Sequence, residues 1–415
     1  MRRSLLNLSM IAGTFALAGT TTAQQADRFA YVVTDMVQQG ANWQFLRKMD
    51  LRTGTYSQVM LNGTDVNYAA LEASSRKPLK SPLTDTRYGN YVNAPFATGV
   101  AAIAYDRKNN RLYYTPMLFD QLRYVDLKTM KVYYVTDQVF TGKPVKSSTQ
   151  GDIVTRMVIA SDGNGYAMTN DATQLIQFTT GKKMQITDLG SIVDDPANKI
   201  SIHNSCSSFG GDMIADDNKN LYVFSARNQV FKVDIETKVA IHLGHINGLP
   251  QGFTVNGAVV NDRNEIVVAS AVQAANWYTV DLSSLSATEY KLNGELWQSS
   301  DLGNSNVLVT KKAEVAAIQA RPIPMEIGDG KVSVYPNPVT GNQFTVQFNT
   351  LEEGTYTVQV TDMMGRQVQQ QVLNVSGDNF VQTISLAKGN AKGIYLVKVL
   401  DSSSKSVFST KLIVQ

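Results

Sequence analysis

Short stretches in which apolar and polar residues alternate follow one another along most of this chain. Residues 111–115 (RLYYT) and 122–125 (LRYV) are typical, and between residues 29 and 318 there is almost no helical periodicity. A two-residue period places alternate side chains on opposite faces of an extended strand. The pattern therefore predicts many short β-strands joined by turns.

Four of these stretches share one scheme, in which an apolar strand, a turn rich in Asp and Asn and a second apolar strand follow one another. They read AAIAYDRKNNRLYY, MVIASDGNGYAM, DMIADDNKNLYVF and GAVVNDRNEIVV. We align them on Asp106, Asp162, Asp216 and Asp262, which are separated by 56, 54 and 46 residues. A repeat of about 50 residues indicates that one supersecondary unit is copied.

A second aspartate ends an alternating strand further on in the copies. It is found in FLRKMDLRT, LRYVDLKT, VFKVDIET and WYTVDLSS as Asp50, Asp126, Asp234 and Asp281, and Thr179 takes its place in one copy. Aspartate side chains accept hydrogen bonds from backbone amides about two residues on, so we expect both sets to close turns. A calcium role is the alternative for DDNKN and SDGNG, but neither has the full ligand series of an EF-hand loop.

Four short strands per copy, repeated about an axis, make the blades of a β-propeller. The stretch resembles the broad propeller class in which blades carry D-x-x-x-N-x-L-Y patterns. Residues 29–61 and 295–320 flank the four clear copies. If the two flanks merge there are five blades, and if each forms its own there are six; we expect six.

Three insertions fall between the last strand of one copy and the first strand of the next. Residues 62–99, 141–152 and 190–211 should therefore emerge at the same end of the ring, which is our candidate binding face. The alternative is solvated loops with some aromatics packed on the propeller. Candidate contact residues in the first insertion are Tyr68, Arg76, Lys77, Lys80, Tyr88, Tyr91 and Phe96.

The first 23 residues have the form of a secretory signal peptide. Arg2 and Arg3 precede an apolar run over residues 5–18, and small residues at 21–23 suit a signal peptidase. No later run approaches the roughly 18 apolar residues that a membrane-spanning helix needs. With a single cysteine, Cys206, the chain cannot form an internal disulfide. We expect export, a mature start near Gln24 and no transmembrane segment.

Charge and motifs give little support to enzymatic chemistry. The 38 basic and 35 acidic residues are spread along the chain, so no basic block predicts nucleic acid binding. The three histidines are not spaced as zinc ligands, and there is no phosphate loop, dinucleotide motif or nucleophile elbow. We therefore expect neither a metal nor a cofactor. Carboxylates from distant blades could still converge in the axial channel, which keeps an enzyme open as an alternative.

The composition changes after the repeats. Residues 319–331 include two prolines and two glycines without strand alternation and are predicted to be a linker between a propeller over 24–318 and a last domain over 332–415. The last domain has short alternating strands and glycine-bearing turns, which predict a small seven-stranded, Ig-like β-sandwich. Pro336 and Pro338 cannot donate ladder hydrogen bonds, so they should lie at a sheet edge.

The motifs of this last domain resemble a known family in order and to the end of the chain. YPNP with Gly341, VTDMMGRQV, GIYLVKV and the closing KLIV are similar to the type A sorting domain of the Bacteroidota type IX secretion system. The sorting-signal residues that the resemblance identifies are Pro336, Asn337, Pro338, Gly341, Gly365, Gly393, Tyr395, Lys398, Lys411, Leu412 and Val414.

The resemblance implies export through the periplasm, recognition by the outer-membrane translocon, and removal of residues 332–415 by a surface peptidase. The protein would then reside at the cell surface, anchored to lipopolysaccharide, or be extracellular. We expect the propeller to act as an adhesin-like binding module for an extracellular or surface ligand. The alternatives are a glycan- or peptide-active enzyme and a structural or assembly partner of an outer-membrane complex.

Overall fold

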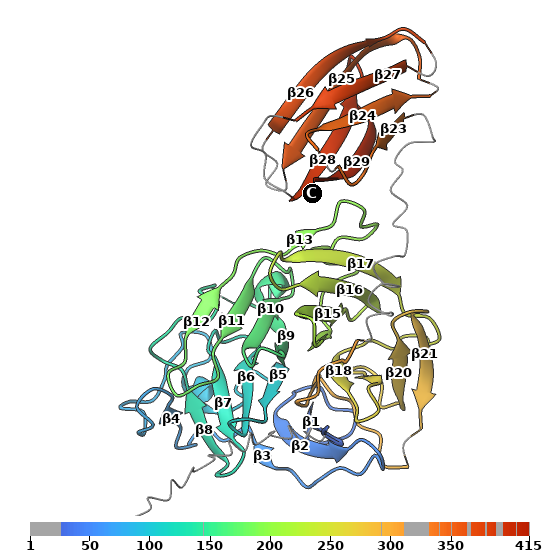
Figure 1. Cartoon of the computed structure of the whole chain (residues 1–415). Coiled ribbons are helices and arrows are strands. Elements are labelled where there is room, and N and C mark those ends of the chain that lie inside the picture. The colour runs from blue at the N-terminus through green and yellow to red at the C-terminus, as the bar shows by residue number, and fades with distance from the viewer. Residues whose placement is uncertain are drawn as a thin grey trace, which may run out of the picture. The chain divides into compact units, whose positions relative to one another are not determined.

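The computed structural model describes residues 26–310 and 332–414, except residues 144, 292, 340, 350, 363–366, 378–379, 387–392 and 404. In these residues the regular elements are strands apart from two short 3₁₀ helices, η1 (Asn90–Asn93) and η2 (Gln150–Asp152). The strands form two compact units, and the predicted all-β fold is confirmed (Figure 1). The predicted signal peptide and linker lie outside the described residues.

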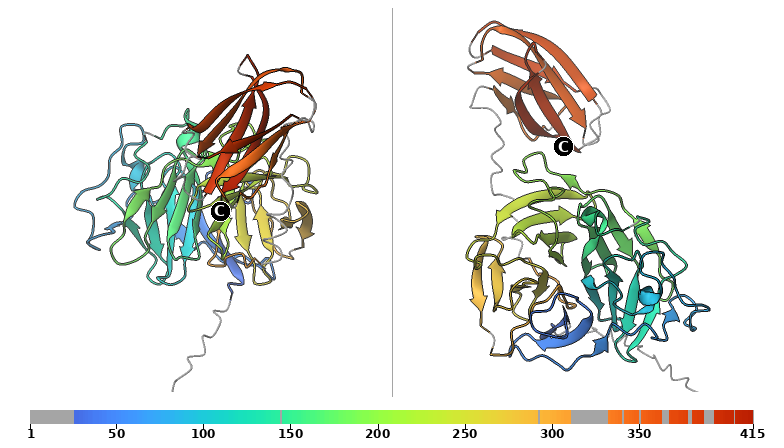
Figure 2. Two further views of the ribbon diagram at one scale, coloured as in Figure 1. Left: turned by 45° about the horizontal axis from the view of Figure 1, so that its top comes forward. Right: turned by 180° about the vertical axis from the view of Figure 1, so that it is seen from behind.

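Five sheets surround an axis in the first unit (Figures 1 and 2), and we number them blades 1 to 5 in ring order. Blade 1 has the order β22-β1-β2-β3 (Asp301–Gly303, Phe29–Thr34, Phe45–Asp50, Leu61–Asn62). Blade 2 is β5-β6-β7-β8-β4 (Val100–Asp106, Arg111–Pro116, Arg123–Asp126, Lys131–Tyr134, Leu71–Glu72). Blade 3 is β9-β10-β11-β12 (Val154–Ile159, Gly165–Thr169, Leu175–Phe178, Ile186–Asp188).

The last two blades follow the same plan. Blade 4 is β14-β15-β16-β17-β13 (Asp212–Ala215, Asn220–Phe224, Gln229–Asp234, Val239–His245, Val193–Asp194). Blade 5 is β18-β19-β20-β21 (Gly257–Val260, Ile266–Ala269, Trp277–Asp281, Ser286–Tyr290). The first strand of each order lies innermost, and each inner strand contacts the inner strands of both neighbouring blades. The unit is therefore a closed β-propeller.

Blade 1 combines both ends of the repeat region, because the late strand β22 pairs with β1. The Asp27 carboxylate strengthens this closure by accepting hydrogen bonds from the backbone N and the Oγ of Ser305, at 2.8 and 2.6 Å. The two flanks thus merge into one sheet, and the described residues form five propeller sheets. Our preference for six blades is wrong, and the alternative of five holds.

The first set of repeat aspartates closes the turns between the two inner strands of blades 2, 3 and 4. Asp106 accepts a bond from the Asn109 backbone N, Asp162 from that of Asn164, and Asp216 from those of Asn218 and Asn220. These bonds confirm the predicted turn chemistry for three of the four copies.

The fourth copy differs by one residue. In blade 5 the turn is closed by Asn261, whose side-chain oxygen accepts bonds from the backbone N of Arg263 and of Glu265, both at 2.9 Å. Asp262 instead accepts a bond from Arg52 Nε of blade 1, at 2.9 Å. The expected role of Asp262 is therefore wrong, because an asparagine oxygen serves the turn equally well.

The second set closes the turns between the third and fourth strands, as predicted. Each of the four aspartates accepts a bond from a backbone N two or three residues on. The donors are Arg52 and Thr53 for Asp50, Lys128 and Thr129 for Asp126, Thr237 for Asp234, and Ser283 and Ser284 for Asp281.

Two of the insertions add strands to the sheets. Strand β4, in the first insertion, pairs parallel with β8 at the outer edge of blade 2, and β13, in the third, pairs parallel with β17 at the outer edge of blade 4. Each insertion thus passes the outer edge of the next blade before the chain reaches that blade's innermost strand. The edge strands β8 and β17 gain a partner, which covers their backbone groups.

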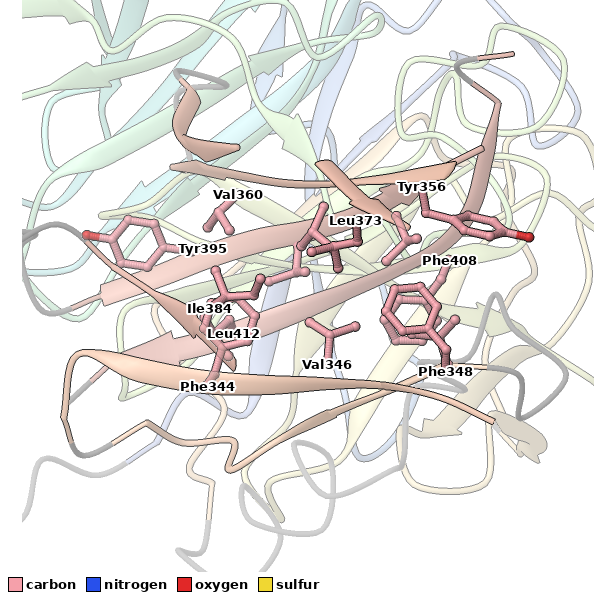
Figure 3. Packing of buried hydrophobic residues seen from close by; sticks show 14 of the residues in the cluster. Phe344, Val346, Phe348, Tyr356, Val360, Leu373, Ile384, Tyr395, Phe408 and Leu412 are labelled. Carbon is pink, nitrogen blue, oxygen red and sulfur yellow. The ribbon is translucent and has the colours of Figure 1, made fainter. Parts of the chain in front are cut away.

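The second unit is a sandwich of two antiparallel sheets, with three and four strands (red in Figure 1). One has the order β23-β24-β27 (Val332–Tyr335, Gln343–Phe348, Phe380–Ser385). The other has the order β26-β25-β28-β29 (Gln367–Val375, Gly354–Asp362, Gly393–Leu400, Ser406–Val414). Alternate residues from both sheets fill an apolar core that includes Phe344, Phe348 and Leu412 (Figure 3). The predicted seven-stranded sandwich is confirmed.

The paired prolines mark the point at which the chain leaves the first sandwich sheet. They follow β23, an edge strand, and their peptide bonds with Tyr335 and Asn337 are cis. The Asn337 side chain then bonds the edge strand of the other sheet, donating to the Lys411 carbonyl oxygen at 2.6 Å and accepting from the Ile413 N at 2.9 Å. The prolines thus lie at a sheet edge, as the sequence predicts.

Candidate functional site

The aromatic residues predicted for the binding face mostly pack on the propeller. Phe96 is fully buried and meets the Tyr114 ring edge-on at 4.7 Å. Tyr68 is partly buried and its hydroxyl donates to the Met130 carbonyl oxygen at 2.8 Å. The Tyr91 hydroxyl accepts a hydrogen bond from Gln44 Nε2. These three side chains therefore serve packing, which is the alternative that the sequence left open.

The charged residues of the same insertion are more accessible. Arg76, Lys77 and Lys80 are exposed, and Tyr88 is half-buried with the Arg87 guanidinium 5.0 Å from the centre of its ring. Arg76 also lines a cavity. Arg76 is thus a predicted contact residue that the structure places in a concave site.

The first insertion is held to blade 2 by a fully buried cation, Arg123 of β7. Its guanidinium donates to the carbonyl oxygens of Val92, Ala94 and Pro95, at 2.6, 2.7 and 2.9 Å, and stacks on the Tyr134 ring at 3.9 Å. A buried charge is tolerated when hydrogen bonds replace its lost water. The end of this insertion is therefore anchored.

Arg156 of β9 does the same for the third insertion. This arginine is also fully buried, and it donates to the carbonyl oxygens of Gly210, at 2.9 Å, and of Ser208. Burial lowers the pKa of its guanidinium to about 10, so it stays charged at neutral pH. No sequence motif marks either arginine, because the carbonyl groups that they bond lie about 30 and 50 residues away along the chain.

A cavity of about 280 Å³ lies where blades 2 and 3 meet. Its lining joins the residues after β4, the start of β6, the end of β8 and the loop between β11 and β12. Four of the lining side chains are cationic and one is a carboxylate. They are Arg76, Arg111, Lys182, Lys183 and Asp137.

Arg111 is the most buried cation in this lining, and only 8% of it is exposed. Its Nη1 donates to the Tyr113 hydroxyl and the Thr180 carbonyl oxygen, both at 3.2 Å. Its guanidinium carbon lies 4.7 Å from the centre of the Tyr124 ring, which in turn stacks on Tyr133. Cation–π contact and hydrogen bonds hold this guanidinium in one place.

The two lysines are placed by contacts between the blades. Gln138, after β8, donates through Nε2 to the Met184 carbonyl oxygen and accepts through Oε1 from the Ile186 N, both at 2.9 Å. These bonds fix the loop that carries Lys182 and Lys183, and both lysines are exposed. The cavity therefore concentrates positive charge on a fixed frame, an arrangement that suits an anion.

The centre of the ring holds a pair of carboxyl groups. Asp212 and Asp301 begin inner strands β14 and β22, are fully buried, and are close enough for each carboxyl group to affect the pKa of the other. Asp212 accepts from the Ala258 N of blade 5 at 2.6 Å, and Asp301 from the Ile103 N of blade 2. Burial, and for Asp301 also the neighbouring charge, raises both pKa values, so the pair retains a proton.

Little space remains around the axis. The cavity between the inner strands has a volume of about 10 Å³, which is room for about one water molecule. Carboxylates do converge here, as the enzyme alternative requires, but both side chains are enclosed. In the described part of the chain no group of three His, Cys, Asp or Glu side chains could hold a metal ion. Among the same residues no helix is long and apolar enough to cross a bilayer.

The predicted sorting residues divide into core and surface positions. Tyr395, Leu412 and Val414 belong to the sandwich core, Lys398 and Lys411 are half-buried, and the exposed ones are Pro336, Asn337, Pro338, Gly341 and Gly393. Gly365 lies outside the described residues.

Solved structures match the chain at low similarity. PorZ, a surface component of the type IX secretion system of Porphyromonas gingivalis, is 15% identical with a TM-score of 0.31, covering 92% of this chain and 51% of PorZ. Virginiamycin B lyase from Staphylococcus aureus is 8% identical (TM-score 0.34, covering 94% and 96%). A protein from Lactobacillus plantarum is 10% identical (TM-score 0.37, covering 86% and 99%). This chain thus spans about half the length of PorZ.

The sequence comparisons bear on the last unit alone. No curated protein matches the chain. Residues 333–415 match the family described as the secretion system C-terminal sorting domain, which covers the sandwich. The chain therefore carries a C-terminal sorting domain of the type IX secretion system and is a protein that this system exports to the cell surface or the extracellular space.

Proposed function

We propose that the exported chain works through its propeller, as an adhesin-like module that binds a ligand at or outside the cell surface. The observation that carries this proposal is the sorting domain, since export of a propeller without a recognised catalytic motif leaves binding as its simplest use. The anchored insertions and the cationic cavity between blades 2 and 3 support the proposal, because binding sites are best held on a rigid frame.

Export also implies partners for residues 332–415. We propose that the translocon recognises the sandwich, that a surface peptidase cuts in the segment 319–331, and that the propeller is then attached to lipopolysaccharide or released. The mature chain would begin near Gln24, after removal of a signal peptide. The match of residues 333–415 to a secretion system sorting domain supports this order of events.

Two alternatives remain proposals. A glycan- or peptide-active enzyme would need the Asp212–Asp301 pair to be reached by substrate, whereas both side chains are fully buried. An assembly role in an outer-membrane complex would make the propeller a structural partner. Repeated co-purification of the same outer-membrane proteins under gentle extraction would favour this second alternative over an adhesin.

The export half of the proposal is tested in the native cells. A chain that ends at residue 331 should lose nearly all surface exposure and accumulate in the periplasm, measured by protease accessibility on intact cells and by fractionation. A matched control with Val372→Thr, an exposed residue of β26, should reach the surface as the natural chain does. Surface exposure of the shortened chain at the natural level would contradict the role of residues 332–415.

The proposed binding function is tested with a panel of ligands. The full mature chain is applied to an array of neutral glycans, acidic glycans and extracellular matrix proteins, and saturation is measured for each. We expect saturable binding to at least one class. If no class binds while export is normal, the adhesin proposal fails and the assembly alternative gains.

A further inference from the structure

We propose that the cavity between blades 2 and 3 binds an acidic sugar, with its carboxylate or phosphate group on Arg111 and its hydroxyl groups on the neighbouring polar atoms. The inference deepens the proposed binding function and rests on it, since it names the ligand class of one site on the propeller. We call this cavity the interblade cavity; the residues that carry the argument are Arg76, Arg111, Asp137, Lys182 and Lys183.

The first argument is the incomplete pairing of Arg111. It is more than nine-tenths buried, and the hydrogen bonds that it donates to described residues all leave from Nη1, to Tyr113, Thr180 and Gly181. Its Nε and Nη2 therefore have no protein acceptor among the described residues. Neither atom is among the fully enclosed side-chain atoms that lack a partner, so both remain accessible in a residue that lines the cavity. A bidentate oxyanion is the acceptor whose geometry fits a guanidinium best.

The second argument is the local charge. Arg76 comes from the first insertion, Arg111 from β6, and Lys182 and Lys183 from the loop of blade 3, so three chain segments supply cations to one cavity. Asp137 is the one carboxylate among the described lining residues. Four cations against one anion raise the local concentration of anions in a concave site. A neutral sugar or a cationic peptide would gain nothing from this field.

The third argument is size and polarity. A volume of about 280 Å³ lies just below the range of small-molecule sites, which begins at about 300 Å³, so the part of the ligand that is bound is small. The Asp137 carboxylate and the Gly181 carbonyl oxygen are acceptors for hydroxyl groups. A ligand that joins one anionic group to several hydroxyl groups uses both features, and an acidic monosaccharide unit is such a ligand.

The frame of the cavity is already built. Gln138 bonds the backbone of the lysine loop, and the Thr179 hydroxyl oxygen accepts a bond from the Gln185 N at 2.9 Å within that loop. Arg111 rests on Tyr124, which stacks on Tyr133 at 4.7 Å between ring centres. The site therefore needs no large rearrangement to bind, which lowers the entropy cost of association.

The test is calorimetric titration of the full mature chain with three probes: glucuronic acid, glucose 6-phosphate and methyl glucoside. We expect saturable binding of at least one acidic probe and none of methyl glucoside. The two acidic probes separate a carboxylate ligand from a phosphate ligand. Raising the salt concentration should weaken the binding, because the exposed lysines and Arg76 are screened.

Two variants assign the binding to the interblade cavity. Arg111→Gln should weaken binding at least about tenfold, which is the loss of one charge-assisted bond. Because this residue packs in the blade interface, tryptophan fluorescence must show the natural fold. Lys182→Glu with Lys183→Glu changes exposed residues only and should also weaken binding at least about tenfold. The charge-matched control, Lys108→Glu with Lys146→Glu, changes two exposed lysines outside the lining and should leave the affinity within about twofold.

The outcomes separate this inference from the proposed function. No binding of either acidic probe at concentrations up to about 10 mM, or binding that the double lysine variant leaves unchanged, would overturn the acidic-sugar site. If the chain nevertheless saturates on a panel ligand and keeps that affinity in the lysine variant, the adhesin proposal stands without this site. If neither acidic probes nor panel ligands bind, both fail.

Discussion

The propeller and the sandwich are both all-β, but they bury different chemistry. Among the described residues, every buried polar or charged residue lies between positions 27 and 304, in the propeller, and these include Arg123, Arg156, Asp212 and Asp301. The buried core of the sandwich consists of aliphatic and aromatic side chains, with polar residues on its outer faces. The interior of the propeller thus uses specific polar contacts between distant segments, whereas the core of the sandwich is built from alternating apolar residues.

This difference follows from how each unit is built. The two sandwich sheets face each other, so side chains at every second position meet in one apolar layer. The propeller must join five blades and hold insertions across their outer edges, and polar contacts such as that of Asp212 with Ala258 fix which segments meet. Such contacts give specificity at the cost of burying charge. The two units should therefore respond differently to substitution and to pH.

The largest effect should come from removing a buried cation. Arg123→Met removes the charge-assisted hydrogen bonds to three buried carbonyl oxygens, of which those of Ala94 and Pro95 keep another donor. The substitution should lower the free energy of unfolding of the propeller by about 3–5 kcal/mol. All three tryptophans, Trp43, Trp277 and Trp297, lie in the propeller, so urea unfolding followed by tryptophan fluorescence measures it. The control is Arg263→Met, an exposed arginine whose loss should cost about 0–1 kcal/mol. Equal losses of unfolding free energy in the two variants would contradict the proposed difference between the propeller and the sandwich.

The stability of the sandwich should depend on the volume of the side chains in its core. Phe344→Ala removes a ring that is 1% exposed and should cost about 3–5 kcal/mol, seen as faster hydrogen exchange in β24 and β27. Phe344→Leu keeps most of the volume and should cost less than about 1.5 kcal/mol. If Phe344→Leu lowered the free energy of unfolding as much as Phe344→Ala, this core would also depend on specific contacts.

The pH dependence should also separate the units. The pKa values of Asp212 and Asp301 are raised by burial, so the folded propeller holds protons that the unfolded chain releases above about pH 4. This contribution to stability is complete at low pH and falls as the pH rises from about 4 toward the raised pKa values. The loss should be on the order of a few kcal/mol by neutral pH, partly offset by carboxyl groups with lowered pKa values such as Glu72.

Asp301→Asn isolates this contribution. The asparagine oxygen can still accept from the Ile103 N, and its amide can donate to Asp212 whatever the pH. The variant should therefore be more stable than the natural chain at pH 8, with a flatter pH profile between pH 5 and 8, measured by urea unfolding with tryptophan fluorescence. A profile that the substitution leaves unchanged would show that the pair does not retain its proton.

A smaller effect is expected at the sandwich edge. Asn337→Ala removes two hydrogen bonds to β29 at an exposed position and should cost about 1 kcal/mol. Thermal unfolding of the sandwich, followed by hydrogen exchange of residues 406–414, measures it. The matched control, Asn374→Ala on β26, should change stability by no more than about 0.5 kcal/mol. If Asn337→Ala cost as much as Phe344→Ala, specific polar contacts would be as important here as in the propeller.

Much of the fold could be predicted because its signals are local. The alternation of apolar and polar residues predicted the strands. The carboxylates of Asp126 and Asp216 accept hydrogen bonds from backbone N–H groups only two residues on, so they mark the turns. The blade number could not be read in the same way, because β22 pairs with β1 from about 270 residues away. Asp262 was misassigned for a related reason, since its partner Arg52 lies in another blade.

The candidate site was predictable only in part. Arg76 was predicted because it lies in the first insertion. Phe96, Tyr68 and Tyr91, which were predicted for the same reason, pack on the propeller. Arg111 and Lys182 could not be found, because they look like ordinary strand and loop residues until blades 2 and 3 meet. The sorting domain could be predicted from the sequence, because its motifs follow one another within residues 333–415, the range that matches the family.

The most direct test of the central claim, that the sandwich is an export address and the propeller the working part, is the intact mass of the native protein from the outer surface of its own cells. We predict a mature start near Gln24 and an end between residues 320 and 332, with heterogeneous added mass where lipopolysaccharide is attached. A surface protein that keeps Gln415 as its unmodified end would contradict removal of the address and would make the sandwich part of the working protein.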